Sequence, residues 1–292
     1  MKVDLEKLRS VAKNIKAVFF DIDGTLVSFK THKIHPNNLQ VLDALRAKGI
    51  KVFVCTGRMV KMTEVLDGVD FDGFIANNGA TCYVPYTEKD AIEGVEPVEV
   101  GSRKLRLIAD RPLPESQLLA IKQRLERKDL PSFHVSFMGA ENYYLNAPSD
   151  VALKIAEEVA VAPPPVTPLE EILRHKIYQL CIYLFGKELD EVMKFIPECE
   201  AASWHPLFAD VNQKGTDKGY GIDRMLEHFG LDLSQSLSFG DGGNDIPMLR
   251  HTALSVAMGN ATEDVANASD YLTDTVDNDG ILKALSELRI LG

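Results

Sequence analysis

Residues 16–26 read KAVFFDIDGTL, an apolar run that ends in two acids and a glycine. Such a run is typical of a buried strand in a parallel sheet. Because side chains alternate along a strand, Asp21 and Asp23 start toward the same side, and Gly24 then allows a sharp turn. Open α/β sheets bind ligands at this edge. Two neighbouring carboxylates repel each other, so the pair is expected to hold a cation or a proton.

Two more polar segments follow apolar runs. Residues 50–58 read IKVFVCTGR, where the hydroxyl of Thr56 and the backbone N–H of Gly57 can hold an anion at a strand-to-helix junction. Residues 236–245 read SLSFGDGGND and contain Asp241 and Asp245 on either side of a glycine pair. Their hard oxygen atoms suit Mg²⁺, which also binds water and substrate phosphate. Each segment alone also fits an ordinary turn with its own polar cap.

A fixed positive charge is available from the segment QKGTDKG at residues 213–219, which contains Lys214 and Lys218 just before a predicted helix. Lysines in such places are usually solvated, but a site that gathers several acids and a phosphate needs a cation. The joint occurrence of these segments at strand ends indicates a Mg²⁺-dependent site that transfers a phosphoryl group through an aspartate.

Strands and helices alternate up to about residue 84 and again after about residue 205, which predicts a mostly parallel sheet. The stretch between them carries long helices, strand-like runs and the proline-rich segment VAPPPVTP at residues 161–168, expected to be an extended surface connection. We predict an α/β fold, a Rossmann-like doubly wound parallel sheet with an inserted α+β domain. The expected core comprises residues 1–84 and 205–292, and the insertion comprises residues 85–204.

Composition limits the partners and the compartment. The chain has 292 residues, is 45% hydrophobic and 26% charged, and carries a net charge of −11. These values exclude a disordered chain and give no general attraction to nucleic acid or anionic membranes. The four cysteines lack CxxC spacing, and no stretch approaches the length of a signal peptide core or membrane span. We expect a cytoplasmic protein, a monomer or weak homodimer, without nucleic-acid or membrane partners.

The same segments resemble the four motifs of the haloacid dehalogenase superfamily of phosphotransferases, in the family's order. Residues 77–80 (NNGA) and 257–261 (AMGNA) are similar to segments of its Cof-type members, which have a C2 cap of the C2B kind. The insertion must lie in the long stretch between Thr56 and Lys218, which agrees with that cap and argues against the β-phosphoglucomutase type. The resemblance implies a catalytic core with an inserted cap that sets specificity.

The resemblance also implies roles for individual residues. Asp21 would attack phosphorus, and Asp23 would serve as general acid and base. The carboxylates of Asp21 and Asp241 and the backbone carbonyl of Asp23 would hold Mg²⁺. Phosphate binding is assigned to Thr56, Gly57, Lys218 and Asn244. Thr25 would hold the shape of the first loop, and Asp245 would orient the waters bound to the metal. Lys218 is preferred to Lys214 because its separation from Asp241 along the chain matches the family.

The implied activity is Mg²⁺-dependent hydrolysis of phosphate monoesters of small phosphorylated metabolites, sugar phosphates first, through an aspartyl phosphate. Tyr143, Tyr144 and Asn146 in the insertion are candidates for contact with the sugar, and packing explains them equally well. The alternatives are a sugar phosphomutase, which returns the phosphoryl group to the sugar, and a non-catalytic module that signals or senses a sugar phosphate.

Overall fold

Strand β1 (Ala17–Phe20) lies inside a sheet and has all of its side chains buried. In the computed structural model, which describes residues 4–292, Ala17 and Phe19 pack into one hydrophobic cluster, and Val18 and Phe20 pack into another. This alternation follows from the two-residue period of a strand and gives the sheet an apolar layer on each face. The apolar run before Asp21 therefore forms the buried strand that the sequence predicts.

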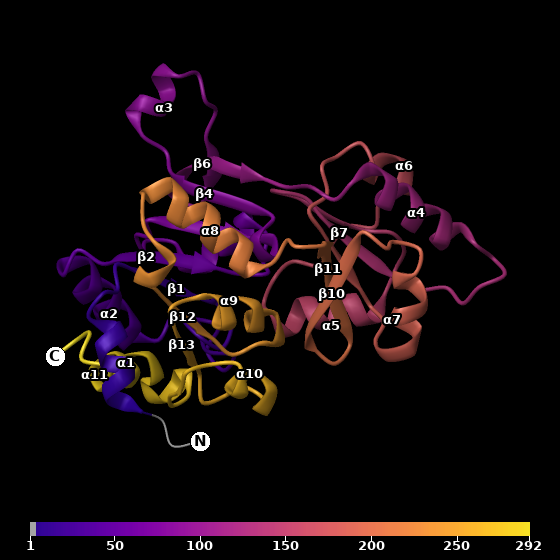
Figure 1. The fold of residues 1–292 in the computed structure, drawn as a ribbon. Coiled ribbons are helices and arrows are strands. Elements are labelled where there is room, and N and C mark those ends of the chain that lie inside the picture. Colours follow the sequence, from indigo (N-terminus) through magenta and orange to yellow (C-terminus); the bar gives the residue numbers. More distant parts are fainter. Residues whose placement is uncertain (1–3) are drawn as a thin grey trace.

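Within residues 4–292, this sheet contains nine strands (Figure 1). The strands from β14 to β3 are parallel, and β4, β6 and β5 extend the sheet in antiparallel pairs. In spatial order they are β14 (Tyr271–Leu272), β13 (Leu254–Ala257), β12 (Ser236–Gly240), β1, β2 (Lys51–Cys55), β3 (Gly73–Ala76), β4 (Thr81–Pro85), β6 (Arg103–Asp110) and β5 (Val98–Val100).

Helices cover both faces of this sheet, so it is doubly wound. Leu42 of α2 and Leu285 of α11 belong to the cluster on one face, where α1 also packs. Ile222 of α8 and Met248 of α9 belong to the cluster on the other face. The helices of this part are α1 (Leu5–Ala12), α2 (Pro36–Ala47), α3 (Glu88–Ile92), α8 (Lys218–Phe229), α9 (Ile246–His251), α10 (Glu263–Asn267) and α11 (Gly280–Glu287). Short 3₁₀ turns are η1 (Val60–Leu66), η2 (Asn77–Gly79), η3 (Leu233–Gln235), η4 (Gly243–Asp245) and η5 (Val276–Asn278).

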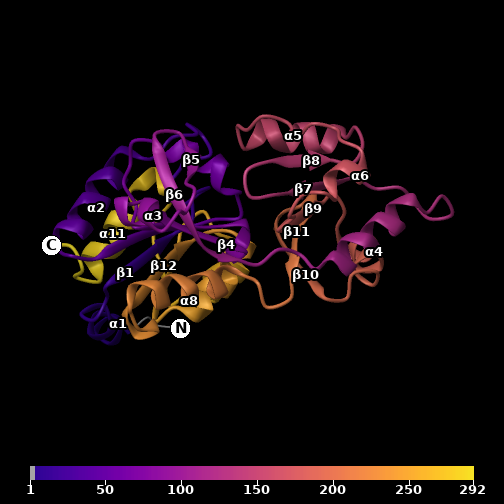
Figure 2. The same cartoon turned by 90° about the horizontal axis from the view of Figure 1, so that it is seen from above.

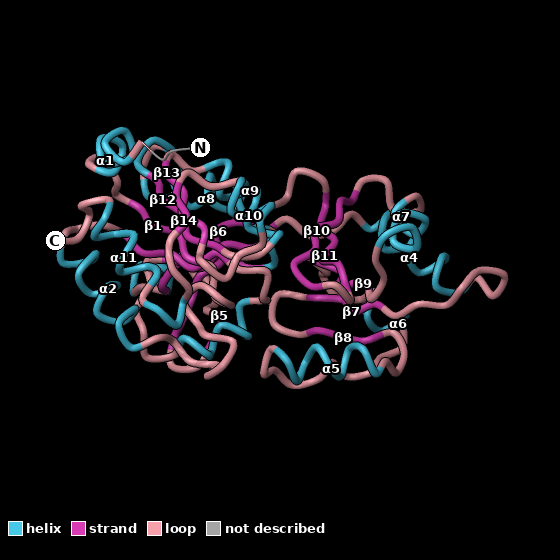
Figure 3. The backbone as a smooth tube through the Cα atoms, turned by 90° about the horizontal axis from the view of Figure 1, so that it is seen from below, coloured by secondary structure: helices cyan, strands magenta, loops and turns pink. Residues whose placement is uncertain are grey.

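A second, antiparallel sheet forms the body beside the first (Figure 2). One face packs on α4, α6 and α7, because Ile121, Ile172 and Val192 share a hydrophobic cluster with Leu180 of the sheet. Helix α5 lies next to β8 in two views (Figures 2 and 3). The strand order is β10 (Cys199–His205), β11 (Phe208–Gln213), β9 (Gln179–Ile182), β7 (Val135–Met138) and β8 (Tyr143–Leu145). The helices are α4 (Glu115–Glu126), α5 (Asp150–Glu158), α6 (Leu169–Ile172) and α7 (Gly186–Met193).

The predicted fold class, a doubly wound α/β core with an inserted α+β domain, is confirmed, but the predicted boundaries at residues 84 and 205 do not follow the sheets. Residues 98–110 form β5 and β6 of the larger sheet, and residues 208–213 form β11 of the smaller one. After β3 the chain reverses without a crossover helix, so the helical rhythm stops before the core sheet does. We call residues 113–213 the cap.

The two connections between core and cap lie side by side. The guanidinium of Arg111 donates hydrogen bonds to the carbonyls of Gly215 at 2.8 Å and Lys214 at 3.2 Å. The proline-rich segment is extended, as predicted, and pairs with the edge of the cap sheet through Leu145. It is not only a surface connection, because Pro164 is buried. Within residues 4–292, no helix has the length and apolar character needed to cross a membrane.

Candidate active site

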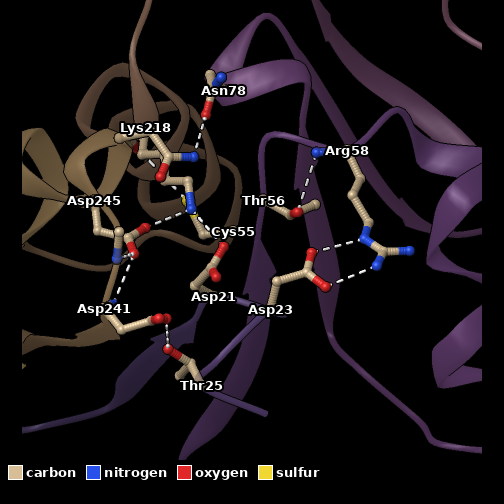
Figure 4. A network of polar contacts seen from close by, with 12 residues as sticks. Asp21, Asp23, Thr25, Cys55, Thr56, Arg58, Asn78, Lys218, Asp241 and Asp245 are labelled. Atoms are coloured by element: carbon tan, nitrogen blue, oxygen red, sulfur yellow. Dashed lines mark hydrogen bonds and ion pairs between the residues drawn. The ribbon is translucent and has the colours of Figure 1, made fainter. Parts of the chain in front are cut away.

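The carboxyl ends of three adjacent parallel strands bring the predicted motifs together (Figure 4). Asp21 follows β1, Thr56 follows β2 and Asp241 follows β12, so each side chain leaves the sheet at the same edge. The backbone N–H of Asp21 still donates to the carbonyl of Phe239 at 3.0 Å, which continues the pairing of β1 with β12. The arrangement is the crevice at strand ends where α/β sheets bind ligands.

Lys218 begins α8 and is fully buried, with its ammonium 2.6 Å from the Asp21 carboxylate and also paired with Asp245. Burial alone would lower the pKa of Lys218, but Asp21 and Asp245 raise it above its usual value, so the side chain stays charged. Lys214, in contrast, is exposed. The structure therefore places Lys218, and not Lys214, beside the predicted nucleophile.

Carboxylate oxygens of Asp21, Asp241 and Asp245 lie within 4.8 Å of one another. Burial raises the pKa of Asp21 to about 7 against the opposing attraction of Lys218, and burial also raises the pKa of Asp241 well above its usual value. One ammonium cannot balance three crowded carboxylates. The hard oxygen donors and the excess negative charge fit Mg²⁺, which Asp21 and Asp241 would hold. The predicted contribution of the Asp23 carbonyl stays a prediction.

The loops around Asp241 pack closely against its side chain. The Asp241 carboxylate accepts hydrogen bonds from the hydroxyl of Thr25 at 2.9 Å and from the side-chain amide of Asn260 at 2.8 Å. A Cβ atom on Gly24, whose φ is +79°, would lie 2.1 Å from an Asp241 oxygen, so only glycine fits there. Thr25 thus contacts the acidic loop, and its predicted role in holding the shape of the first loop stays a prediction. Asn260, in the segment AMGNA, has a contact that the sequence did not reveal.

Asp245 supports the loop that carries Asp241. One of its oxygens accepts hydrogen bonds from the backbone N–H groups of Asp241 and Gly242, both at 2.9 Å, and the other faces Lys218. The side chain is fully buried. Its oxygens are therefore engaged in holding the loop and orienting the lysine, whereas the role that the resemblance implies, orientation of the waters bound to the metal, stays a prediction.

Asp23 forms a bidentate ion pair with Arg58 (Figure 4). The Nε and Nη2 atoms of Arg58 each lie 2.7 Å from one Asp23 oxygen. Arg58 Nη2 also donates to the backbone carbonyl of Val159, at the end of α5, at 3.2 Å. Burial would lower the pKa of Arg58, but Asp23 raises it, so the guanidinium stays charged. Arg58 belongs to the segment TGR at residues 56–58. Its contacts with Asp23 and with the cap depend on tertiary structure, so the sequence did not reveal them.

Asn78 connects the loops that are predicted to bind phosphate to the cap. Its side-chain amide nitrogen donates to Gln179 and Asp210 of the cap, both at 3.1 Å, and its oxygen accepts from the amide nitrogen of Asn244 at 3.1 Å. Asn78 adopts a left-handed conformation with φ +52°, which asparagine tolerates better than most residues. A Cβ on Gly57 would come within about 3.2 Å of Asn78 and Asn244, so these loops pack tightly.

A cavity of about 400 Å³ lies between these core residues and the cap. It is lined by most of the predicted site residues, including Asp21, Asp23, Thr56, Gly57, Asn244 and Asp241. Thr25, Lys218 and Asp245 lie behind this layer, in contact with it. The volume is within the usual range for small-molecule sites.

The cap side of the cavity was only partly foreseen. Tyr143, one of the three candidates for contact with the sugar, lines the cavity. Tyr144 instead stacks on His175 with ring centroids 5.1 Å apart, and Asn146 accepts a hydrogen bond from the backbone of the neighbouring strand. The main cap residues at the cavity, missed from the sequence, come from β7, β9 and β11 and the residue after β9: Ser136, Gln179, Cys181, Tyr183 and Asp210. The alternation of Gln179, Cys181 and Tyr183 with apolar residues was the available signal.

The chain matches the family model of the haloacid dehalogenase-like hydrolases over residues 18–97 and 98–285, and it belongs to that family. Within the family it is a phosphatase of the Cof type, which confirms both the resemblance read from the motifs and the predicted enzyme class.

Solved structures and curated relatives agree with this assignment. The chain is 38% identical to the HAD subclass IIB sugar phosphatase BT4131 (94% of this chain, 100% of that chain, TM-score 0.80). It is 34% identical to the phosphatase BT1666 from Bacteroides thetaiotaomicron (95% and 96%, TM-score 0.81). YcsE of Bacillus subtilis, a 5-amino-6-(5-phospho-D-ribitylamino)uracil phosphatase, is 24% identical over 277 residues, or 93% of this chain and 95% of its own.

Proposed function

We propose that this protein hydrolyses phosphate monoesters of small metabolites, with sugar phosphates as the first candidates, by a Mg²⁺-dependent reaction through an aspartyl phosphate. The observation that carries the proposal is the Asp21 carboxylate, which lines the cavity next to Asp23 and is paired with the buried Lys218 at 2.6 Å. Similarity to a sugar phosphatase over nearly the whole chain supports the substrate class.

The proposed reaction has two displacements at one phosphorus atom. In the first, an Asp21 oxygen attacks phosphorus, the bond to the substrate's alcohol oxygen breaks, and Asp23 gives that oxygen a proton. In the second, water attacks phosphorus, Asp23 takes a proton from the water, and the bond to Asp21 breaks to release phosphate. Asp21 and Asp241 would hold Mg²⁺, whose positive charge would offset the repulsion between the carboxylate and the phosphate dianion.

Other residues of this chain hold the phosphoryl group and the proton carrier in place. The Thr56 hydroxyl and the backbone N–H of Gly57 would bind phosphate oxygens at the end of β2, and Asn244 would approach from the neighbouring loop. The charge of Lys218 offsets negative charge that spreads over the phosphoryl oxygens. Arg58 orients Asp23, because both oxygens of that carboxylate face its guanidinium.

The compartment, partners and oligomeric state stay predictions. Cys55, Cys82, Cys181 and Cys199 are free thiols, which supports a reducing compartment such as the cytoplasm. The net charge of −11 supports the absence of nucleic-acid partners. A monomer or weak homodimer remains the expectation for the chain in solution.

Release of inorganic phosphate from a panel of phosphorylated metabolites, with Mg²⁺ and with a chelator, tests the proposal. We expect release only with the metal, and we expect Asp241→Asn to lose it because the carboxylate pair is broken. Asp190→Asn is the matched control, since Asp190 lies exposed on α7 in the cap. Release that persists in the chelator, or in Asp241→Asn, would contradict the proposed metal dependence. Conversion to an isomeric sugar phosphate without phosphate release would favour the phosphomutase.

A further inference from the structure

Among the described side chains that line the cavity, acidic groups outnumber basic groups. Among the described residues that line it, the groups able to carry positive charge are Arg58 and His205. Arg58 is engaged by both oxygens of Asp23, and the Nε2 atom of His205 lies 3.0 Å from a Glu158 oxygen. Each basic group therefore already faces an acid.

The cap contributes a buried carboxylate to the lining of the cavity. Asp210 of β11 is 3% exposed, and it lines the cavity from the cap side. Two of its partners are neutral: Asn78 donates to one oxygen at 3.1 Å, and the thiol of Cys181 donates to the other at 3.2 Å. The Asn78 contact also ties Asp210 to the loop beside Asn244, so the carboxylate is held near the place where the phosphoryl group enters.

The neighbouring cap side chains are uncharged hydrogen-bonding groups. The hydroxyls of Ser136 and Tyr183 lie 2.8 Å apart and form one pair, and Gln179 lies on the same face of the sheet. On α5, Ala152, Ile155 and Ala156 line an apolar side of the cavity. The hydroxyl groups of a ligand fit the polar side chains of the cap sheet, and its C–H groups fit the apolar side chains of α5.

We propose that Asp210 makes the enzyme select phosphate monoesters of uncharged, polyhydroxylated alcohols and reject esters whose alcohol part carries a second acidic group. This inference rests on the proposed function. It adds to that function a statement of which charge the cap accepts on the alcohol part of the substrate. A second phosphate or a carboxylate would meet Asp210 and Glu158, while both basic groups among the described lining residues already face an acid. Charges interact strongly where water is excluded. Placing a like charge against a competing ligand is a common source of specificity.

Two matched substrate series test the inference. The hexose series compares glucose 6-phosphate with glucose 1,6-bisphosphate and 6-phosphogluconate, and the triose series compares glycerol 3-phosphate with 3-phosphoglycerate and 2,3-bisphosphoglycerate. We expect kcat/KM for the neutral member to exceed that for each acidic member by at least about 100-fold, as several kcal/mol of like-charge repulsion implies. Para-nitrophenyl phosphate reports hydrolysis without any sugar contact.

The isosteric change Asp210→Asn removes the charge and keeps the size. We expect this change to lower the ratio of kcat/KM for the neutral ester to kcat/KM for the acidic ester by at least about tenfold. The repulsion is lost, while the hydrogen bond from Asn78 can remain. Asp190→Asn is the control on the opposite side of the cap sheet, where α7 packs, and should leave the ratio unchanged. Thermal melting of both variants shows whether the cap remains folded.

The outcomes separate this inference from the proposed function. Absence of phosphate release from every ester, including para-nitrophenyl phosphate, would overturn the proposed function and this inference with it. Release from para-nitrophenyl phosphate without a preference for the neutral sugar esters would overturn this inference alone. An unchanged ratio in a folded Asp210→Asn variant would do the same.

Discussion

The two sides of the cavity are built on different principles. On the core side, charged groups are paired at short range: Lys218 with Asp21 and Asp245, and Arg58 with Asp23. On the cap side, the contacts are hydrogen bonds among groups such as Ser136, Tyr183 and Gln179, next to an apolar helix. In the proposed function, the core side binds and transfers a phosphoryl group whatever its ester, whereas the cap side discriminates between esters.

This comparison makes a general prediction about kinetics. Substitutions at the core side remove groups that act on the transferring phosphoryl group, so they should lower kcat for every substrate. Substitutions at the cap side should change the ranking of substrates more than the rate on the best one. Four single substitutions test the core side and the contacts that join it to the cap.

Asp21→Asn should have the largest effect. An amide cannot form the acyl phosphate, so we expect kcat to fall by about 10⁴-fold or more, as for other nucleophile deletions. The fold should persist, because the new side chain can still accept from Lys218. Steady-state phosphate release and thermal melting measure the two effects, with Asp190→Asn as the control. A variant with kcat near that of the wild type would show that Asp21 is not the nucleophile.

Lys218→Met should lower kcat by about 10³-fold, because a preorganised charge at the transferring group is lost. It should also destabilise the metal-free protein by about 3–5 kcal/mol, since Asp21 and Asp245 are left buried without their cation. Urea denaturation with and without Mg²⁺ measures this, and the metal should recover part of the loss. An unchanged unfolding free energy would contradict the account of this buried network.

Arg58→Ala should lower kcat by about 10²-fold and change KM little, because Asp23 loses the group that fixes its position. Arg58→Lys should restore part of the rate, since it returns a cation without the bidentate geometry. The kcat and KM values of both variants, measured on one substrate, distinguish positioning from a loss of folding. Equal rates in Arg58→Ala and the wild type would remove Arg58 from the mechanism.

Asn78→Asp should have the smallest effect of the four, a fall in kcat/KM of about tenfold. It places a second carboxylate beside Asp210, and the repulsion should loosen the contact between core and cap. The double variant with Asp210→Asn should recover most of the loss, because one of the two charges is then gone. Hydrogen exchange of the backbone amides in η2 and β11 measures the contact between Asn78 and Asp210, and exchange should be faster where that contact is loosened. Failure of the double variant to recover would mean that charge repulsion is not the cause.

The sequence was most informative about the core side. Asp21, Thr56 and Asp241 each lie directly after an apolar strand, so the order of motifs along the chain was enough to place them at one edge of the sheet. Lys218 required a choice between two nearby lysines, and its position at the start of α8 favoured the one that the structure places beside Asp21. Local sequence carries this information because each motif is a strand end and the turn that follows it.

The cap side and the domain boundaries were harder to predict for physical reasons. β5 and β6 join the core sheet as antiparallel strands, and nothing in their sequence distinguishes them from strands of the cap. Asp210 and Gln179 meet at the cavity although they belong to different strands, and Asn78 reaches them only because core and cap are in contact. Contacts of this kind depend on the tertiary arrangement and have no local pattern.

The central claim is that Asp21 carries the phosphoryl group during turnover. Acid quenching of the enzyme during steady hydrolysis of para-nitrophenyl phosphate with Mg²⁺, followed by borohydride reduction and peptide mapping by mass spectrometry, tests it directly. The account predicts reductive modification of the aspartate at position 21, absent from the Asp21→Asn variant and from samples without substrate. Modification at another residue, or full turnover by Asp21→Asn, would contradict it.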